Sequence, residues 1–288
     1  MENTQSFYDL CIQDKCYNSH DFLLTAKKLV EYGYRTVAIN QTIDEEALET
    51  NKKKKKGDRE TNEIVPVPIT LKSEKSCPGL KILNRLTVTF AEKSTLYKVM
   101  QSEQVKKYHI FAVIPKSNEA LQFVCDTVDA DIISFDPSDS RTMKMNRKIC
   151  NMLLERDVYF ELMYFPAIQD ATCRKNIINK AHLYHQYAKS KNVIITSGAL
   201  NQLSLRGPYD VINLGLLFGL SEVQAKSAIS SACNDLINRA VGRRMGKALI
   251  VAEPIVTLTS DDAAEEMEVD SDEPALKKSK GNQNDDTK

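Results

Sequence analysis

Seven short apolar runs alternate with helical stretches along most of this 288-residue chain. Each run is rich in Val, Ile, Phe or Tyr and is bounded by polar or turn residues, as is typical of strands buried in a sheet. The runs cover residues 7–12, 35–40, 82–90, 109–114, 131–135, 158–164 and 192–196. Because parallel strands need crossovers of about a dozen residues, the alternation predicts a parallel α/β sheet covered by helices.

Two architectures fit this pattern, a closed β/α barrel and an open doubly wound sheet. The alternation continues through the body of the chain without the signature of a second domain, which favours the barrel. No Gly-x-Gly-x-x-Gly follows any run, which counts against a dinucleotide site. A regular barrel has eight strands, but here two helices, expected at 209–218 and 221–242, follow the seventh run. We therefore expect an irregular TIM-like barrel of about seven strands over residues 1–258.

The chain changes character near residue 259. Segment 259–288 has an acidic part followed by a short basic part and contains almost no large apolar side chains. It cannot bury enough apolar surface to fold, so we expect a disordered tail. The whole chain has a formal net charge of +0. From Ser260 onward it carries −6, which leaves +6 on the body.

Five of the six net positive charges of the body lie in one lysine run within a polar stretch. This run predicts a basic insertion loop around 45–63. The run consists of Lys52, Lys53, Lys54, Lys55 and Lys56. It fits a solvated loop, a nuclear localisation signal or a loop that contacts phosphates. Lys277 and Lys278 in the tail form a second candidate for nuclear import.

Composition excludes several classes of protein. The seven cysteines are odd in number and form no CxxC pair, which fits free thiols in a reducing compartment. No stretch approaches the roughly 18 apolar residues of a membrane span. Glu161 and Asp136 lie in or after apolar runs and fit either an acid–base pair or carboxylates satisfied by loop amides and arginine. No zinc spacing, phosphate loop or nucleophile elbow appears, so neither a metal nor a cofactor is expected.

Several sequence blocks together form a recognisable signature. The most specific block runs from Arg206-Gly207-Pro208-Tyr209-Asp210 to Asn213 and the Gly219-Leu220-Ser221 turn. Others are Phe160-Glu161-Leu162, with Tyr164, Asp170, Thr172 and Arg174; Val37-Ala38-Ile39-Asn40; and Lys81 to Thr87. Over roughly residues 7–250 these blocks resemble the p30 family, the thirty-kilodalton protein subunit of eukaryotic ribonuclease P and ribonuclease MRP.

This resemblance implies a barrel related to the polymerase-and-histidinol-phosphatase metallohydrolases. Those relatives carry a His-x-His metal motif after the first strand, but here the matching stretch is Asp9-Leu10-Cys11-Ile12-Gln13. The resemblance thus implies a non-catalytic subunit, with no catalytic residue or metal of its own, that binds and stabilises a catalytic RNA. Its implied partners are ribonuclease P RNA, MRP RNA, a small ferredoxin-like protein subunit and other proteins of the particles. The implied processes are removal of tRNA 5′ leaders and pre-rRNA processing, in the nucleus and nucleolus and away from any membrane.

RNA contact by such a barrel would be mainly electrostatic, with cations displacing counterions along the backbone. The candidate RNA-binding residues are Arg85, Lys116, Arg174, Arg206 and Lys81, and weaker basic positions are Arg141, Lys144, Arg147, Lys148, Arg243 and Arg244. Each also fits an ordinary surface charge or ion pair. We expect removal of the charge of Arg85 or Arg206 to weaken RNA association. The alternative functions are a metal-dependent phosphoesterase on the same barrel and a barrel that binds a small molecule without RNA.

Overall fold

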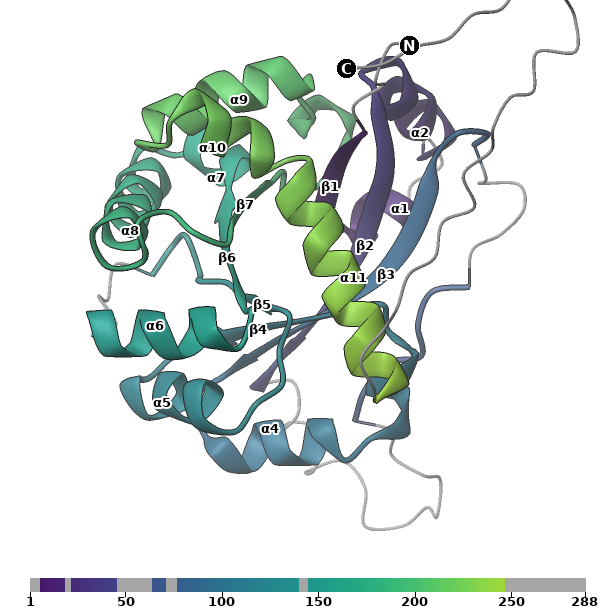
Figure 1. Ribbon diagram of the computed structural model, residues 1–288. Helices are drawn as coiled ribbons and strands as arrows, with labels where there is room; N and C mark the ends of the chain where they lie inside the picture. Colours follow the sequence, from purple (N-terminus) through teal and green to yellow (C-terminus); the bar gives the residue numbers. More distant parts are fainter. Residues whose placement is uncertain (1–5, 19–21, 46–63, 71–76, 140–144, 247–288) are drawn as a thin grey trace, which may run out of the picture. The chain divides into compact units, whose positions relative to one another are not determined.

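The computed structural model describes residues 6–18, 22–45, 64–70, 77–139 and 145–246 (Figure 1). These residues all belong to the first of two compact units, 1–249 and 250–288. The lysine run at 52–56, Lys277, Lys278, the predicted tail and the proposed boundary at 258 lie outside the described residues.

The described chain alternates strands and helices in the predicted order. The strands are β1 (Phe7–Gln13), β2 (Tyr34–Asp44), β3 (Lys81–Phe90), β4 (Ile110–Pro115), β5 (Ile132–Ile133), β6 (Tyr159–Met163) and β7 (Val193–Thr196). The helices are α1 (Asp14–Asn18), α2 (Phe22–Glu31), α4 (Lys93–Met100), α5 (Asn118–Asp126), α6 (Arg147–Glu155), α7 (Tyr164–Gln169), α8 (Ala171–Ala188), α9 (Pro208–Leu217), α10 (Glu222–Ser227) and α11 (Ser231–Met245). Two short 3₁₀ helices are η2 (Glu103–Lys107) and η3 (Gln202–Ser204). None of the described helices is both long and apolar enough to cross a membrane.

Polar residues placed directly before helices fix where those helices begin. The side chain of Ser117 accepts a hydrogen bond from the amide of Ala120 at the start of α5. Asn146 and Asp170 do the same at the starts of α6 and α8. Such caps satisfy amides that have no partner within the helix. These three capping residues therefore mark where α5, α6 and α8 begin.

The seven strands form one parallel sheet in the order of the sequence, from β1 to β7. The sheet closes where β1 meets the residues just after β7: the amide of Gly198 donates to the carbonyl of Cys11, and the amide of Gln13 donates to the carbonyl of Ala199. The predicted TIM-like barrel is therefore confirmed over the open doubly wound sheet.

The place of an eighth strand is taken by the connection between α10 and α11. The amide of Ile195 in β7 donates to the carbonyl of Ala228, and the amide of Tyr8 in β1 donates to the carbonyl of Ile229. These two carbonyls join the opposite edges of the sheet. This connection also corrects the prediction of one helix over 221–242, because residues 228–230 separate α10 from α11.

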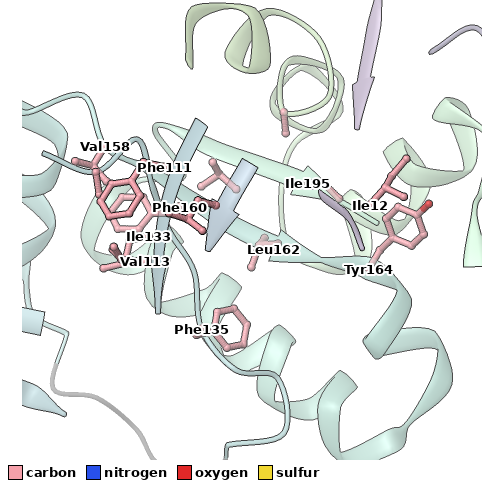
Figure 2. Close-up of a cluster of buried hydrophobic side chains, with 14 of the residues drawn as sticks. Ile12, Phe111, Val113, Ile133, Phe135, Val158, Phe160, Leu162, Tyr164 and Ile195 are labelled. Atoms are coloured by element: carbon pink, nitrogen blue, oxygen red, sulfur yellow. The ribbon is translucent and has the colours of Figure 1, made fainter. Parts of the chain in front are cut away.

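Helices cover the outside of the barrel and bury one layer of side chains against the sheet. Figure 2 shows part of this layer, with Phe111 and Val113 of β4, Ile133 of β5 and Phe160 and Leu162 of β6. Residues two apart on each strand share a face, so the intervening residues point into the barrel. Burial on both faces explains why the strands are apolar almost throughout their length.

The inside of the barrel near the amino ends of the strands is apolar and is closed by α11. The strand side chains of this inner cluster are Leu10, Ala38, Leu83, Ile110, Ala112, Ile132, Tyr159 and Ile194. Cys233 and Leu236 of α11 pack against them, and Figure 1 shows α11 lying across the sheet. Buried Asp131, just before β5, accepts hydrogen bonds from Arg239 and Arg243 and so fixes α11 in this place.

Candidate functional site

Further along the strands, the inward positions change from apolar to polar. Arg85 and Thr87 follow Leu83 at two-residue intervals on β3, and Glu161 follows Tyr159 on β6. Catalytic residues of TIM-barrel enzymes lie toward these carboxyl ends of the strands. The polar interior is therefore the first place to examine for chemistry.

Arg85 and Glu161 form a two-pronged ion pair across the barrel. The Nη1 atom of Arg85 lies 2.5 Å from Oε1 of Glu161, and Nη2 lies 2.6 Å from Oε2. Arg85 also donates to the carbonyl of Leu10 and to the hydroxyl of Thr87, while Thr196 donates to Glu161. Burial alone would raise the pKa of Glu161, but the charge and hydrogen bonds of Arg85 outweigh it and hold the pKa below its usual value.

A second buried acid, Asp9 of β1, lies beside this pair. Its Oδ1 atom accepts hydrogen bonds from the amides of Ser197 and Cys11, at 3.0 and 3.3 Å. Its Oδ2 atom has no partner among the described residues. Burial raises the pKa of Asp9 to about 6. Burial also raises the pKa of the Cys11 thiol to about 12, which keeps this cysteine in its unreactive neutral form.

The arrangement of these groups does not support acid–base chemistry. Arg85 is 1% exposed and Glu161 is 0% exposed, and the charged groups of the two residues bind each other. Asp136, which the sequence offered as a partner for Glu161, instead accepts a hydrogen bond from the amide of Ser138 in its own loop. Of the two interpretations of Glu161, the carboxylate satisfied by arginine is confirmed. Within the described part of the chain, no group of three or more His, Cys, Asp or Glu side chains is placed to hold a metal ion.

The same burial corrects the prediction that Arg85 contacts RNA. A guanidinium that is 1% exposed and bonded to a carboxylate, a carbonyl and a hydroxyl cannot reach a phosphate in solution. The signal that could have revealed this role is present in the sequence. Arg85 and Glu161 are opposite charges at inward positions of two otherwise apolar runs, and burying either alone is costly.

The other candidates do not form a single patch. Lys81 begins β3, whereas Lys116 follows β4 and donates its amide to the carbonyl of Phe90 at the far end of β3. The ten residues of β3 separate these two lysines by about 30 Å at the usual rise of a strand. A single RNA phosphate cluster therefore cannot include both.

Arg174 and Arg206 lie on the surface in different settings. Arg174 is exposed in the first turn of α8. Arg206 is half-buried, and its Nη1 atom donates to the carbonyls of Leu203 and Leu205. Its backbone is held between Tyr34 and Tyr164, which fixes the entry into α9. Of the weaker candidates, Arg243 pairs with Asp131, and Arg141 and Lys144 lie outside the described residues.

Large apolar side chains are exposed on α9 and α10. Tyr209 and Leu217 are both 70% exposed and Val223 is 80% exposed. Leu217 and Val223 flank the turn that joins the two helices. Gly215 lets these helices pack closely, because a Cβ atom there would lie 2.8 Å from the Cβ of Ala225. The helix pair therefore presents exposed apolar side chains, and we call Tyr209, Leu216, Leu217 and Val223 together the apolar surface.

Comparison with known proteins gives consistent matches over the described barrel. A family model described as RNase P subunit p30 matches residues 6–245. The mouse ribonuclease P protein subunit p30 is 38% identical over 202 residues, covering 70% of this chain and 74% of the mouse protein. The ribonuclease P/MRP protein subunit RPP1 of Saccharomyces cerevisiae is 23% identical over 239 residues, covering 81% of this chain and 77% of the yeast protein.

Among solved structures, a chain in the cryo-EM structure of archaeal ribonuclease P with mature tRNA has the same fold. The TM-score is 0.57 at 16% sequence identity, with 86% of this chain and 97% of that chain covered. The match includes nearly the whole archaeal chain, so the barrel described above is the shared part.

Proposed function

This chain belongs to the RNase P subunit p30 family, and we propose that it is a non-catalytic protein subunit of the ribonuclease P ribonucleoprotein. In this proposal it binds and stabilises the RNA of the particle, and that RNA cuts the 5′ leader from precursor tRNA. The family match over residues 6–245 is the observation that carries the proposal.

The interior of the barrel supports a role without catalysis. The position where a barrel enzyme would expose its catalytic groups contains the closed Arg85–Glu161 pair. The alternative function, a metal-dependent phosphoesterase, would need free carboxylates or histidines at this position. Hydrolysis of a phosphoester by the purified protein with added Mn²⁺ or Zn²⁺ would favour that alternative.

The proposal extends to ribonuclease MRP and pre-rRNA processing because the yeast relative is named as a subunit of both particles. A nuclear and nucleolar location follows from these processes, with the lysines at 52–56, Lys277 and Lys278 as targeting residues. Lys116, Arg174, Arg206 and Lys81 stay proposed RNA contacts, on separate parts of the surface.

A protein partner is proposed to cover the apolar surface of α9 and α10. The resemblance implies a small ferredoxin-like subunit, and exposed Tyr209, Leu217 and Val223 provide the aromatic and aliphatic anchors that protein interfaces favour. Leu217→Asp with Val223→Asp should abolish recovery of this subunit with the full-length chain. Leu24→Asp is the matched control, because Leu24 is 55% exposed on α2, outside this surface. Equal recovery with both variants would disprove the assignment of the surface.

The decisive experiment is recovery of the tagged full-length protein from its own cells, with sequencing of the bound RNA. We expect ribonuclease P RNA and MRP RNA to be enriched, and precursor tRNA with uncut 5′ leaders to accumulate when the protein is depleted. Recovery of no structured RNA, together with normal tRNA maturation after depletion, would contradict the proposed function.

A further inference from the structure

A surface groove lies between α6 and the last turn of α8, on the outside of the barrel. Its volume is about 420 Å³, and its lining includes Arg147 and Asn151 from α6, and Gln186 and Tyr187 from α8. Lys189 and Lys191, which follow α8, form its rim. Figure 1 shows α6 and α8 as neighbours on the side of the barrel away from β1 and β2. The groove is distinct from the polar interior and from the apolar surface of α9 and α10.

The groove is strongly basic. Arg147, Lys189 and Lys191 are all exposed, and no carboxylate is among the residues that line the groove. Glu155 and Asp157 follow the lining residue Leu154 along the chain but do not belong to the lining. Three cations around one concave surface create a local positive potential that attracts an anionic ligand.

An unusual backbone places two of these cations on the same rim. Lys189, Ser190 and Asn192 have φ angles of 53°, 55° and 50°, in the left-handed region that non-glycine residues rarely adopt. Such strained positions persist only where the surrounding contacts hold them, and they cluster at functional sites.

Specific contacts hold this segment from two sides. The side chain of Gln224 in α10 donates to the carbonyl of Lys189 at 3.3 Å. The hydroxyl oxygen of Ser190 lies 3.2 Å from Nδ1 of His185. The amide of Lys191 donates to the carbonyl of Ala188. The backbone of the rim is therefore fixed before any ligand arrives, which lowers the entropic cost of binding.

The geometry points to this groove as a binding site for the phosphate backbone of RNA, an inference that rests on the proposed function. The planar guanidinium of Arg147 can grip one phosphate with two hydrogen bonds, and Lys189 and Lys191 act as point charges for neighbouring phosphates. Asn151, Gln186 and Tyr187 offer hydrogen bonds to ribose hydroxyls, with the ring of Tyr187 as an additional apolar surface. Contacts of this kind hold RNA by shape and charge, without reading its sequence.

The test uses the full-length protein and the ribonuclease P RNA of its source organism, transcribed in vitro. The groove variant combines Arg147→Gln, Lys189→Gln and Lys191→Gln. The control variant combines Lys27→Gln, Lys98→Gln and Lys107→Gln, which removes the same charge from exposed positions on α2, α4 and η2. Kd is measured by filter binding at several KCl concentrations, and thermal unfolding checks that both variants are folded.

The groove variant should bind at least tenfold more weakly at physiological salt. The slope of log K against log salt should become shallower by about 2, because each lost phosphate contact removes about 0.7–0.9 from it. A third variant, with Lys189→Arg and Lys191→Arg, should retain most of the affinity, since charge rather than shape is at stake. The control variant should stay within about twofold of the wild type.

Two negative results have different meanings. If the wild type prefers ribonuclease P RNA over an unrelated RNA of equal length but the groove and control variants behave alike, the groove assignment is wrong and the proposed function stands. If the wild type shows no such preference, both proposals fail.

Discussion

Arg85 and Glu161 are 76 residues apart in sequence, yet they form the most buried ion pair among the described residues, with N–O distances of 2.5 and 2.6 Å. Arg85→Met would leave the carboxylate of Glu161 buried without its partner. We expect this change to lower the free energy of unfolding by about 3–5 kcal/mol. Urea unfolding of the variant and the wild type measures the loss.

Removing both charges provides the control for this prediction. The double variant Arg85→Met/Glu161→Leu should be more stable than Arg85→Met alone, because apolar pairs of similar volume often replace buried ion pairs at little cost. Stability of Arg85→Met within about 1 kcal/mol of the wild type would contradict the importance of the pair.

The burial of Asp9 should make the free energy of unfolding depend on pH. Burial raises its pKa to about 6 in the folded protein, above the usual value of about 3.9 in unfolded chains. Between these two values the folded state binds more protons, so stability falls as the pH rises. The wild type should lose about 1 kcal/mol relative to Asp9→Asn between pH 5 and pH 7.5. If the difference in unfolding free energy between the wild type and Asp9→Asn does not depend on pH, the pKa of Asp9 is not raised by burial.

The close packing of α9 against α10 leaves no room for a side chain at Gly215. A side chain there meets the Cβ of Ala225 at 2.8 Å and Cδ1 of Ile195 at 3.0 Å, so Gly215→Val should cost at least about 2 kcal/mol. Gly207→Ala is the control, since its Cβ meets only the side chain of Asp210 at 3.4 Å; it should cost less than about 1 kcal/mol. Thermal unfolding of the two variants side by side checks this prediction.

The ion pairs of Asp131 should stabilise the packing of α11 over the amino end of the barrel. Asp131→Asn weakens the contacts to Arg239 and Arg243, and we expect a loss of about 2 kcal/mol. Asp129→Asn removes only a contact of Arg239 with a carboxylate that is 59% exposed, which should cost less than about 1 kcal/mol. Hydrogen exchange of α11 amides should accelerate in the first variant alone. Unchanged exchange in Asp131→Asn would show that apolar packing alone holds the helix.

The order of the strands could be predicted from the sequence, and the observed bounds of β1 and β7 differ from expectation by one residue. These short Val- and Ile-rich runs are buried on both faces. β2 extends four residues beyond the expected 35–40, to Asp44, and β5 has only two residues, Ile132–Ile133, of the expected 131–135. The break between α10 and α11 could not be predicted, because residues 228–230 contain no Gly or Pro. It arises from hydrogen bonds of Ala228 and Ile229 to Ile195 and Tyr8, which are distant in sequence.

The candidate sites depended even more on contacts that a sequence does not display. Arg85 was a plausible RNA contact by residue type alone; the sequence places opposite charges in two strand-like runs, but only the structure shows that Arg85 and Glu161 face each other. The groove at Lys189 and Lys191 arises from left-handed backbone angles and a hydrogen bond from Gln224. No local pattern in the sequence indicates these features.

The carbonyls of Ala228 and Ile229 join β7 to β1, so the last described elements complete a sheet that the first element begins. During synthesis on the ribosome, the amides of Ile195 in β7 and Tyr8 in β1 lack these partners until this segment leaves the exit tunnel. Exposed strand edges are templates for aggregation, and contacts between distant parts of a chain form slowly. A chain truncated before residue 228 would lack both contacts for good, so we expect it to aggregate more readily than the full-length chain.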